Sequence, residues 1–372
     1  MQRLVCVFQG NTHGTELRNY RETVAAMSQN RKDGGQRKRF EDALRGVEVA
    51  IRKLFIEAFT KNIAAINERA LIEALKAGDI LKAAEIVRMT SAQMFVLQEA
   101  VRSGFILGGG MISTDLPRAI RGRWGFNGRH LRAEQWIQRN GVDLIGGITE
   151  DTDRVVRKAI TEGLQEGRSH QRIARDITGR RVGNKRVDGF LGLSSDQTDH
   201  VLRARQMLSD PNQIRNYFTR DRATGKLKPR YRLSDRRYDR LVQRAISEGR
   251  ALKPAELDKV MEAHRAKALG YRGKVIAKDQ AHSALAAGRE EGYLQVLENP
   301  EVETVTVRWQ HNRSLEPRED HAAMNGTIIQ LGEAFDFPDG TQMTRPHDPV
   351  GGAKHSVGCR CTGIYRVRLR RD

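Results

Sequence analysis

The chain contains 372 residues, of which 65 are lysine or arginine and 46 are aspartate or glutamate, so its formal net charge is +19. This length predicts two or three domains, and a hydrophobic content of 38% is too high for a wholly disordered chain. No run approaches the roughly 18 apolar residues that a transmembrane helix needs. A protein that spans a membrane is therefore not expected. Three cysteines cannot form a disulfide framework, so a protein stabilised by disulfides is not expected either.

The positive charge is concentrated in the middle of the chain. Residues 151–280 contain 31 basic and 17 acidic residues, a net charge of +14, whereas residues 301–372 contain 10 of each. An imbalance of this size favours contact with a polyanion. A solvated, arginine-rich helical surface would have the same composition.

The first part of the chain is expected to be helical. Residues 1–40 are polar and basic and are interpreted as a flexible basic arm, followed by a helical region over 41–148. In this region apolar residues recur at spacings of three and four, and Asp79 is placed to cap a helix. The glycines at 108–110 are expected to end a helix.

Residues 149–300 are expected to form a basic helical middle domain. Helix starts are predicted where an acidic or capping residue, or a proline, precedes periodic apolar residues, at 149–151, Ser169, Asp210 followed by Pro211, and Pro254. A separate long helix is predicted from about Gly273 to Pro300.

The most basic stretch of the chain interleaves cationic and aromatic side chains. Such a pattern is suited to binding a nucleic-acid backbone. The side chains that we expect to contact DNA are Arg220, Arg222, Lys226, Lys228, Arg230, Arg232, Arg236 and Arg237.

After Pro300 the pattern changes to short alternating segments separated by glycine, proline and aspartate. Residues 302–309 and 359–368 both alternate in the way that strands do. Residues 301–372 are therefore expected to form a small α+β domain. The whole chain is assigned to the α+β class, mostly helical before this domain.

The C-terminal region also collects histidines and two cysteines. Cys359 and Cys361 point the same way on an extended chain, and with nearby histidines they would complete a tetrahedral zinc site. The metal-ligand candidates are His321, His347, His355, Cys359 and Cys361. Two small buried cysteines without a metal are the alternative, so no firm cofactor is assigned and zinc is the one candidate.

Arg318 and His321 form a second candidate cluster. A histidine beside an arginine can act as general acid or base on a phosphodiester while the arginine stabilises the charge. A salt-bridged helix start has the same composition. We expect no catalysis here, and these two residues are kept only as an alternative.

The order of these residues resembles the C-terminal domain of the Mu F-type head morphogenesis proteins, the minor capsid proteins of tailed bacteriophages. The residues that carry the resemblance are Trp309, Arg318, His321, Gly326, Pro346, Asp348, Cys359, Arg360 and Cys361. The resemblance covers about 149–182 and 270–370. Some members of the family have Cys-x-x-Cys where this chain has Arg318-x-x-His321, so a metal here would need His321 or another histidine.

The resemblance implies a low-copy structural protein of the virion and no enzymatic activity. Its implied partners are the phage portal and the major capsid or scaffolding protein, with non-specific contact to double-stranded DNA and no membrane in the assembled head. The implied location is the capsid interior or portal vertex, and the host cytoplasm during assembly. The alternative is a barnase-like nuclease that acts through Arg318 and His321.

Overall fold

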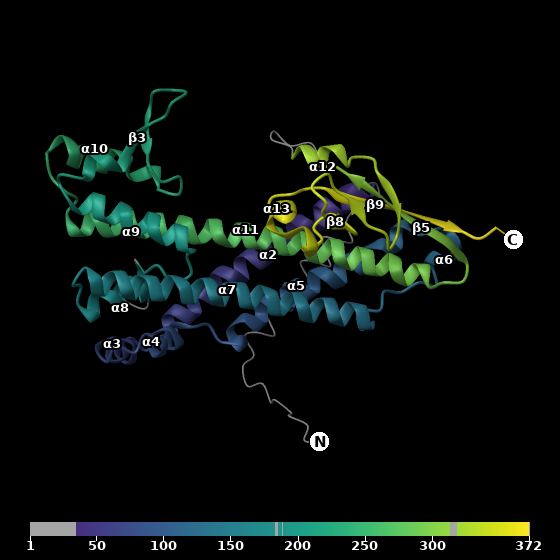
Figure 1. Ribbon diagram of the computed structural model, residues 1–372, viewed down its shortest axis with the longest axis horizontal. Coiled ribbons are helices and arrows are strands. Elements are labelled where there is room, and N and C mark those ends of the chain that lie inside the picture. Colours follow the sequence, from purple (N-terminus) through teal and green to yellow (C-terminus); the bar gives the residue numbers. More distant parts are fainter. Residues whose placement is uncertain (1–34, 183–184, 188, 313–317, 372) are drawn as a thin grey trace, which may run out of the picture. The chain divides into compact units, whose positions relative to one another are not determined.

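The computed structural model describes residues 35–182, 185–187, 189–312 and 318–371, which form two compact units (Figure 1). Unit 1 contains the described residues of 1–55, 95–143 and 274–372, and unit 2 contains those of 56–94 and 144–273. Both units are mainly helical and carry small antiparallel sheets, so the expected α+β class is confirmed. The expected basic arm falls mostly on residues 1–34, which lie outside the described residues.

Four long helices contribute residues to both units: α2 (Gln36–Ala65), α5 (Ser91–Met111), α7 (Leu131–Gln165) and α11 (Pro254–Leu297). Unit 1 also contains η1 (Ile112–Asp115), α6 (Arg118–Arg121), β5 (Val302–Gln310), α12 (Glu319–Ala323), β6 (Ile328–Gln330), β7 (Phe335–Asp336), β8 (Gln342–Met343), η4 (Pro349–Gly351), α13 (Gly352–Ser356) and β9 (Thr362–Leu369). Unit 2 also contains α3 (Glu68–Lys76), α4 (Ile80–Val87), α8 (His170–Thr178), β1 (Arg180–Val182), β2 (Lys185–Val187), α9 (Ser195–Ser209), η2 (Ile214–Tyr217), β3 (Phe218–Arg220), β4 (Leu227–Pro229), η3 (Arg236–Tyr238) and α10 (Asp239–Ser247). None of the helices in the described segments combines the length and apolarity needed to span a bilayer.

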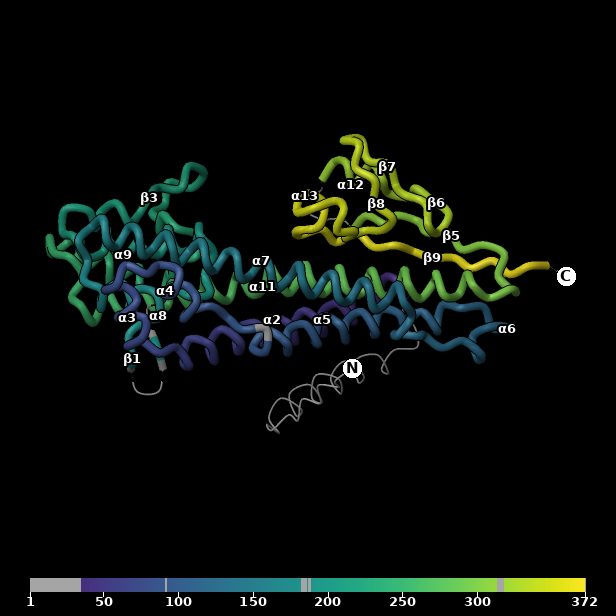
Figure 2. The backbone as a smooth tube through the Cα atoms, turned by 60° about the horizontal axis from the view of Figure 1, so that its bottom comes forward, coloured from purple at the N-terminus to yellow at the C-terminus, as the bar shows by residue number. Residues whose placement is uncertain are grey.

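The core of unit 1 lies on one face of the three-stranded sheet β6-β5-β9. Along β5, Val305, Val307 and Trp309 are buried and alternate with residues of intermediate exposure, which confirms the strand predicted from the sequence. In the antiparallel pair β5–β9, Val307 lies opposite Tyr365 and Trp309 opposite Gly363. Figure 2 shows β9 running alongside the C-terminal part of α11.

Glycines let two helices of unit 1 approach unusually closely. A Cβ atom on Gly288 of α11 would lie 2.0 Å from the carbonyl oxygen of Phe105 in α5, and one on Gly108 would lie 2.4 Å from that of Leu285. Only residues without a Cβ allow the two backbones to come this near. The glycines at 108–110 were expected to end a helix, and α5 ends at Met111, directly after them.

Unit 2 contains helix caps that the sequence predicted. The Asp79 carboxylate accepts a hydrogen bond from the Lys82 amide at 2.8 Å, and the Ser169 hydroxyl accepts one from the Arg172 amide at 3.3 Å. Both residues precede a helix, α4 and α8, as expected. The buried Arg272 is paired with Asp151 at 2.8 Å.

Three predicted helix boundaries are wrong. Residues 149–151 lie inside α7, and α11 runs without a break through Gly270 and Gly273, where the sequence suggested two helices. Asp210 ends α9 and accepts a hydrogen bond from the Asn212 amide at 2.8 Å, so Pro211 begins a turn and not an α-helix. Acidic residues and glycines are tolerated inside long helices where neighbouring helices supply the packing energy.

The glycine contact can be tested with an alanine pair. Gly288→Ala is expected to lower the free energy of unfolding by about 1–3 kcal/mol, since its Cβ would overlap the Phe105 carbonyl. Gly110→Ala is the matched control, because this residue is exposed in α5 with nothing near its Cβ position, and should gain up to about 1 kcal/mol. Urea denaturation followed by circular dichroism would measure both, and equal stabilities would contradict the close contact.

Candidate functional site

The candidate site lies in unit 1, where β5, α12 and the segment that precedes β9 meet. Trp309, at the end of β5, is fully buried. Its ring packs edge-to-face against three other rings. The distance between ring centroids is 5.5 Å to His321 and 5.2 Å to each of Phe335 and Phe337. Trp309 therefore forms the apolar wall of the site.

Helix α12 places His321 against this wall. Gly326, with φ of +92°, turns the chain after the helix, and its amide donates to the Trp309 carbonyl at 2.8 Å. The left-handed conformation favours glycine here. Arg318 precedes α12 and donates hydrogen bonds to the backbone carbonyls of His355 and Val357. Gly326 and Arg318, both residues of the motif that carries the family resemblance, thus hold the backbone that surrounds His321.

The two cysteines direct their sulfur atoms toward histidine nitrogens. The Sγ atoms of Cys359 and Cys361 lie 3.3 Å and 3.6 Å from Nδ1 of His321. Cys361 Sγ also lies 3.5 Å from Nδ1 of His311. A hydrogen bond with the Cys359 thiol is the main cause that lowers the pKa of Cys361, and it is joined by one from the Asn312 amide.

The backbone of the same segment is held by two other histidines. Nε2 of His347 lies 2.9 Å from the Cys359 carbonyl oxygen, and Nε2 of His282 lies 2.9 Å from that of Cys361. The two imidazole rings are stacked, with centroids 3.7 Å apart. Complete burial, together with the charge that His347 would carry, holds the pKa of His282 well below its usual value, so His282 is a neutral donor.

A chain of polar contacts leads away from the far side of His321. Its Nε2 lies 3.0 Å from Nδ1 of His355, whose Nε2 lies 3.0 Å from an Asp339 carboxylate oxygen. Hydrogen bonds from Lys354 and from the Thr341 amide lower the pKa of Asp339, which therefore remains a carboxylate acceptor. This arrangement fixes which nitrogen of each imidazole carries its proton.

Pro346 and Asp348, two residues of the motif that carries the family resemblance, lie beside a buried ion pair. Asp348 caps η4 and accepts hydrogen bonds from the Val350 amide at 3.2 Å and the Thr344 amide at 2.9 Å. Arg345 is 6% exposed and pairs with Glu290 of α11. Burial alone would lower the pKa of Arg345, but the charges of Glu290 and Asp348 raise it.

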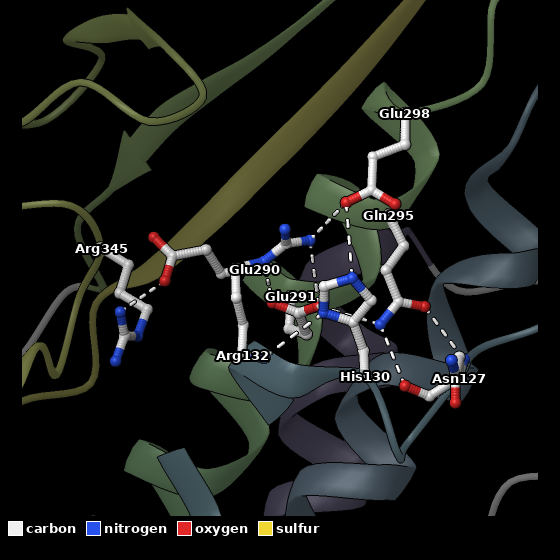
Figure 3. Close-up of polar contacts among 8 residues, drawn as sticks. All are labelled: Asn127, His130, Arg132, Glu290, Glu291, Gln295, Glu298 and Arg345. Atoms are coloured by element: carbon white, nitrogen blue, oxygen red, sulfur yellow. Dashed lines mark hydrogen bonds and ion pairs between the residues drawn. The ribbon is translucent and has the colours of Figure 1, made fainter. Parts of the chain in front are cut away.

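A second polar cluster attaches the start of α7 to α11 (Figure 3). Arg132 donates to Glu291 at 2.9 Å and to Glu298 at 2.8 Å. Ahead of α7, the Asn127 backbone exchanges hydrogen bonds with the Gln295 side chain at 2.9 Å and 3.0 Å. In the same view Glu290 points the other way, toward Arg345, so adjacent residues of α11 bind two different segments of unit 1.

The structure brings together only part of the predicted metal-ligand set. His321, Cys359 and Cys361 place one donor atom each within 4.8 Å of one another. His347 contacts Cys359 through its carbonyl oxygen, at 2.9 Å, and through its thiol. His355 forms a second group with His321 and Asp320, whose donor atoms also lie within 4.8 Å of one another. Arg360, between the cysteines, is exposed.

The sequence placed His311 in the same histidine and cysteine region but not among the metal-ligand candidates, and it assigned no role to His282 or Arg289. His311 directly follows β5, so only the pairing of β5 with β9 reveals that it approaches Cys361. His282 and Arg289 are seven residues apart, which places them on one face of α11. This spacing indicates a shared helix face, but it does not reveal which segment that face contacts.

The geometry does not favour the nuclease alternative. His321 is 2% exposed, and its two ring nitrogens face the cysteine sulfurs and His355. Arg318 is directed toward backbone carbonyls. A general acid or base must reach a substrate proton, and neither side chain is presented in that way.

The basic segment lies in unit 2, around the β3–β4 hairpin and η3. All eight predicted DNA-contacting side chains are exposed. Three of them pair with aspartates of the same segment: Lys228 with Asp221 at 2.6 Å, Arg236 with Asp239 at 3.2 Å, and Arg237 with Asp235 at 2.6 Å. Over 215–240 the sequence contains 10 basic and 3 acidic residues, so this surface retains a net charge of +7.

The fold and the site define a mostly helical protein with a C-terminal α+β module built around buried histidine and cysteine side chains. Residues 238–364 match the family described as Phage Mu protein F like protein, which supports the resemblance over this part of the chain. The match begins at α10, in a stretch where the sequence analysis found no motif, while the resemblance noted at 149–182 lies outside it.

The chain is also similar to the Uncharacterized protein YqbB of Bacillus subtilis strain 168, with 29% identity over 93 residues. The alignment covers 24% of this chain and 29% of that relative, so the chain spans less than a third of the relative's length. No solved structure matches the chain at a significant level.

The buried ion pair beside the motif gives a test of how the module is attached. Glu290→Gln should lower the free energy of unfolding by about 1–3 kcal/mol, because it leaves the buried Arg345 charge with the more distant Asp348 carboxylate, at 3.9 Å, as its one remaining anionic partner among the described residues. Glu290→Gln combined with Arg345→Met should recover part of this loss, since the buried cation is removed and Asp348 keeps the hydrogen bonds from the Thr344 and Val350 amides. Thermal unfolding of these two variants and of Arg345→Met alone would measure the coupling, and additive effects of the two single substitutions would contradict it.

Proposed function

We propose that this chain is a bacteriophage head morphogenesis protein, a low-copy structural component that associates with the portal or the capsid interior. The match of residues 238–364 to the Phage Mu protein F like family carries this proposal. The buried arrangement of the motif residues supports a structural role over a catalytic one, since Trp309, His321 and Cys361 are all at most 2% exposed.

The exposed basic segment supports a second part of the proposal, non-specific contact with packaged double-stranded DNA. Lysine and arginine side chains bind phosphates without sequence preference, and the release of counterions makes such binding salt-dependent. The exposed side chains around the β3–β4 hairpin have the charge that this contact requires.

The C-terminal residues have a different surface chemistry. Residues 301–372 carry no net charge and expose the apolar side chains Ile328, Val350 and Val357. Exposed apolar groups surrounded by polar residues suit contact with another protein. We therefore assign these exposed apolar side chains to contact with the portal, capsid or scaffolding partner.

Mass spectrometry of purified procapsids and virions tests the class directly. The chain should be present at low copy number beside the portal and major capsid proteins, and its absence from both particles would contradict the proposal. Ile328→Asp combined with Val350→Asp should lower the copy number, because a carboxylate would be desolvated at the interface. Leu81→Asp, at an equally exposed apolar position of unit 2, is the matched control.

DNA contact is tested by the salt dependence of binding. Replacing Arg222, Lys226, Lys228 and Arg232 by glutamine should reduce the slope of log K against log salt concentration by up to about 3–4, since each phosphate contact contributes about 0.9. Replacing Arg366, Arg368, Arg370 and Arg371, which are also exposed, should leave the slope unchanged. Fluorescence anisotropy with a duplex of mixed sequence would measure both. A wild-type affinity that is insensitive to salt would exclude this contact.

A further inference from the structure

We propose that His311, His321, Cys359 and Cys361 form a structural zinc site in the C-terminal module. This inference is independent of the proposed role in the phage head. It rests on the placement of four donor atoms: Nδ1 of each histidine and Sγ of each cysteine.

Three sulfur–nitrogen distances among these donor atoms fit a tetrahedral zinc ion, and His311 joins the other three donors through its contact with Cys361. Zinc binds thiolate sulfur at about 2.3 Å and imidazole nitrogen at about 2.0–2.1 Å, so sulfur and nitrogen at neighbouring corners of a tetrahedron lie about 3.5 Å apart. The observed Sγ–Nδ1 distances are 3.3 Å and 3.6 Å to His321 and 3.5 Å to His311. The His321, Cys359 and Cys361 donor atoms also lie within 4.8 Å of one another.

The surroundings of His321 orient it as a metal ligand. A histidine that binds zinc through one nitrogen commonly donates its other N–H to a carboxylate or another acceptor, which fixes the ring and its tautomer. Here Nε2 of His321 lies 3.0 Å from His355, which in turn contacts the Asp339 carboxylate at 3.0 Å. Asp339, held as an acceptor by Lys354, thereby directs the lone pair of His321 Nδ1 toward the sulfur atoms.

The cysteine backbone is held in place without the metal. His347 and His282 contact the two cysteine carbonyl oxygens at 2.9 Å, and the Cys361 amide donates to Cys359 Sγ at 3.3 Å. Backbone N–H donors to sulfur stabilise a thiolate ligand. The pair therefore presents its sulfur atoms in one direction before any ion binds.

The donor set and its burial select the metal and its role. Two thiolates and two imidazoles favour zinc over magnesium or calcium, which bind oxygen ligands. With two thiolates, a divalent ion leaves the site neutral, which suits its place beside the buried Trp309 ring. Four protein ligands leave no open position for a substrate, so the site is structural and not catalytic.

The test is metal analysis of the full chain, purified under reducing conditions and loaded with zinc. Elemental analysis should find about one zinc per chain after dialysis. Cobalt exchanged for zinc should give a thiolate-to-cobalt charge-transfer band and the intense visible bands of a tetrahedral ion. Absence of bound zinc, together with a weak octahedral cobalt spectrum, would overturn the proposal.

Variants identify the ligands. Cys361→Ser and His321→Ala should each abolish stoichiometric zinc, while Cys6→Ser and the exposed His200→Ala should retain it. His311→Cys provides a measurement that does not depend on losing the metal, since a third thiolate should intensify the cobalt charge-transfer band. A spectrum identical to wild type would exclude His311.

The orienting contacts have their own test. Asp339→Asn should weaken zinc binding by about 10–100-fold, measured by competition with a chromogenic chelator, because loss of such a contact typically costs that factor. Unchanged affinity would show that the His355–Asp339 contact does not act on the metal and would remove this part of the proposal.

Discussion

The rest of unit 1 depends on the attachment of the segment 359–365 to α11. His282 and Arg289 are both 2% exposed, and they contact the backbone of this segment at Cys361 and Gly363. A buried guanidinium is tolerated only when its donors are paired and its charge is stabilised. Arg289 meets most of this requirement through the Gly363 carbonyl, Gln36, and the rings of Phe40 and Tyr365, while its Nε is buried without a hydrogen-bond partner among the described residues.

This attachment determines where the cysteines lie. The Arg289 contact fixes β9 along the helix, and β9 fixes β5 through their antiparallel pairing, in which Gly363 lies opposite Trp309. Any side chain at Gly363 would crowd Tyr365 and Val307, at 3.0 Å and 3.1 Å from its Cβ. The position of Trp309, and with it that of His311 and His321, follows from this single register. The helix is in turn held by its glycine contact with α5.

The sequence was informative at several positions where structure depends on local chemistry, although the helix starts predicted at 149–151 and at Asp210 were wrong. Caps at Asp79 and Ser169, the start of α11 at Pro254 and the alternation of β5 were all predicted, because each depends on residues within one or two turns. The continuity of α7 and α11 was not predicted, since it depends on packing by distant helices. Composition likewise suggested a histidine and cysteine cluster but could not select its members. Only the pairing of β5 with β9 brings His311 to Cys361, while His347 and His355 contact other groups.

The sequence shows the distribution of charge but not which charged side chains are buried, and this difference decides which of them can bind a partner. Residues 301–372 have no net charge, yet they include the buried Arg345, which is paired with Glu290, and Asp348, which caps η4. In the basic segment of unit 2 the aspartates pair with three cations and leave a net charge of +7 on exposed side chains. Arginine thus stabilises the fold where it is enclosed, and provides a surface for a polyanion where it is exposed. Net charge alone does not separate these roles, whereas burial does, so the DNA-contact proposal rests on the exposed segment and not on the total of +19.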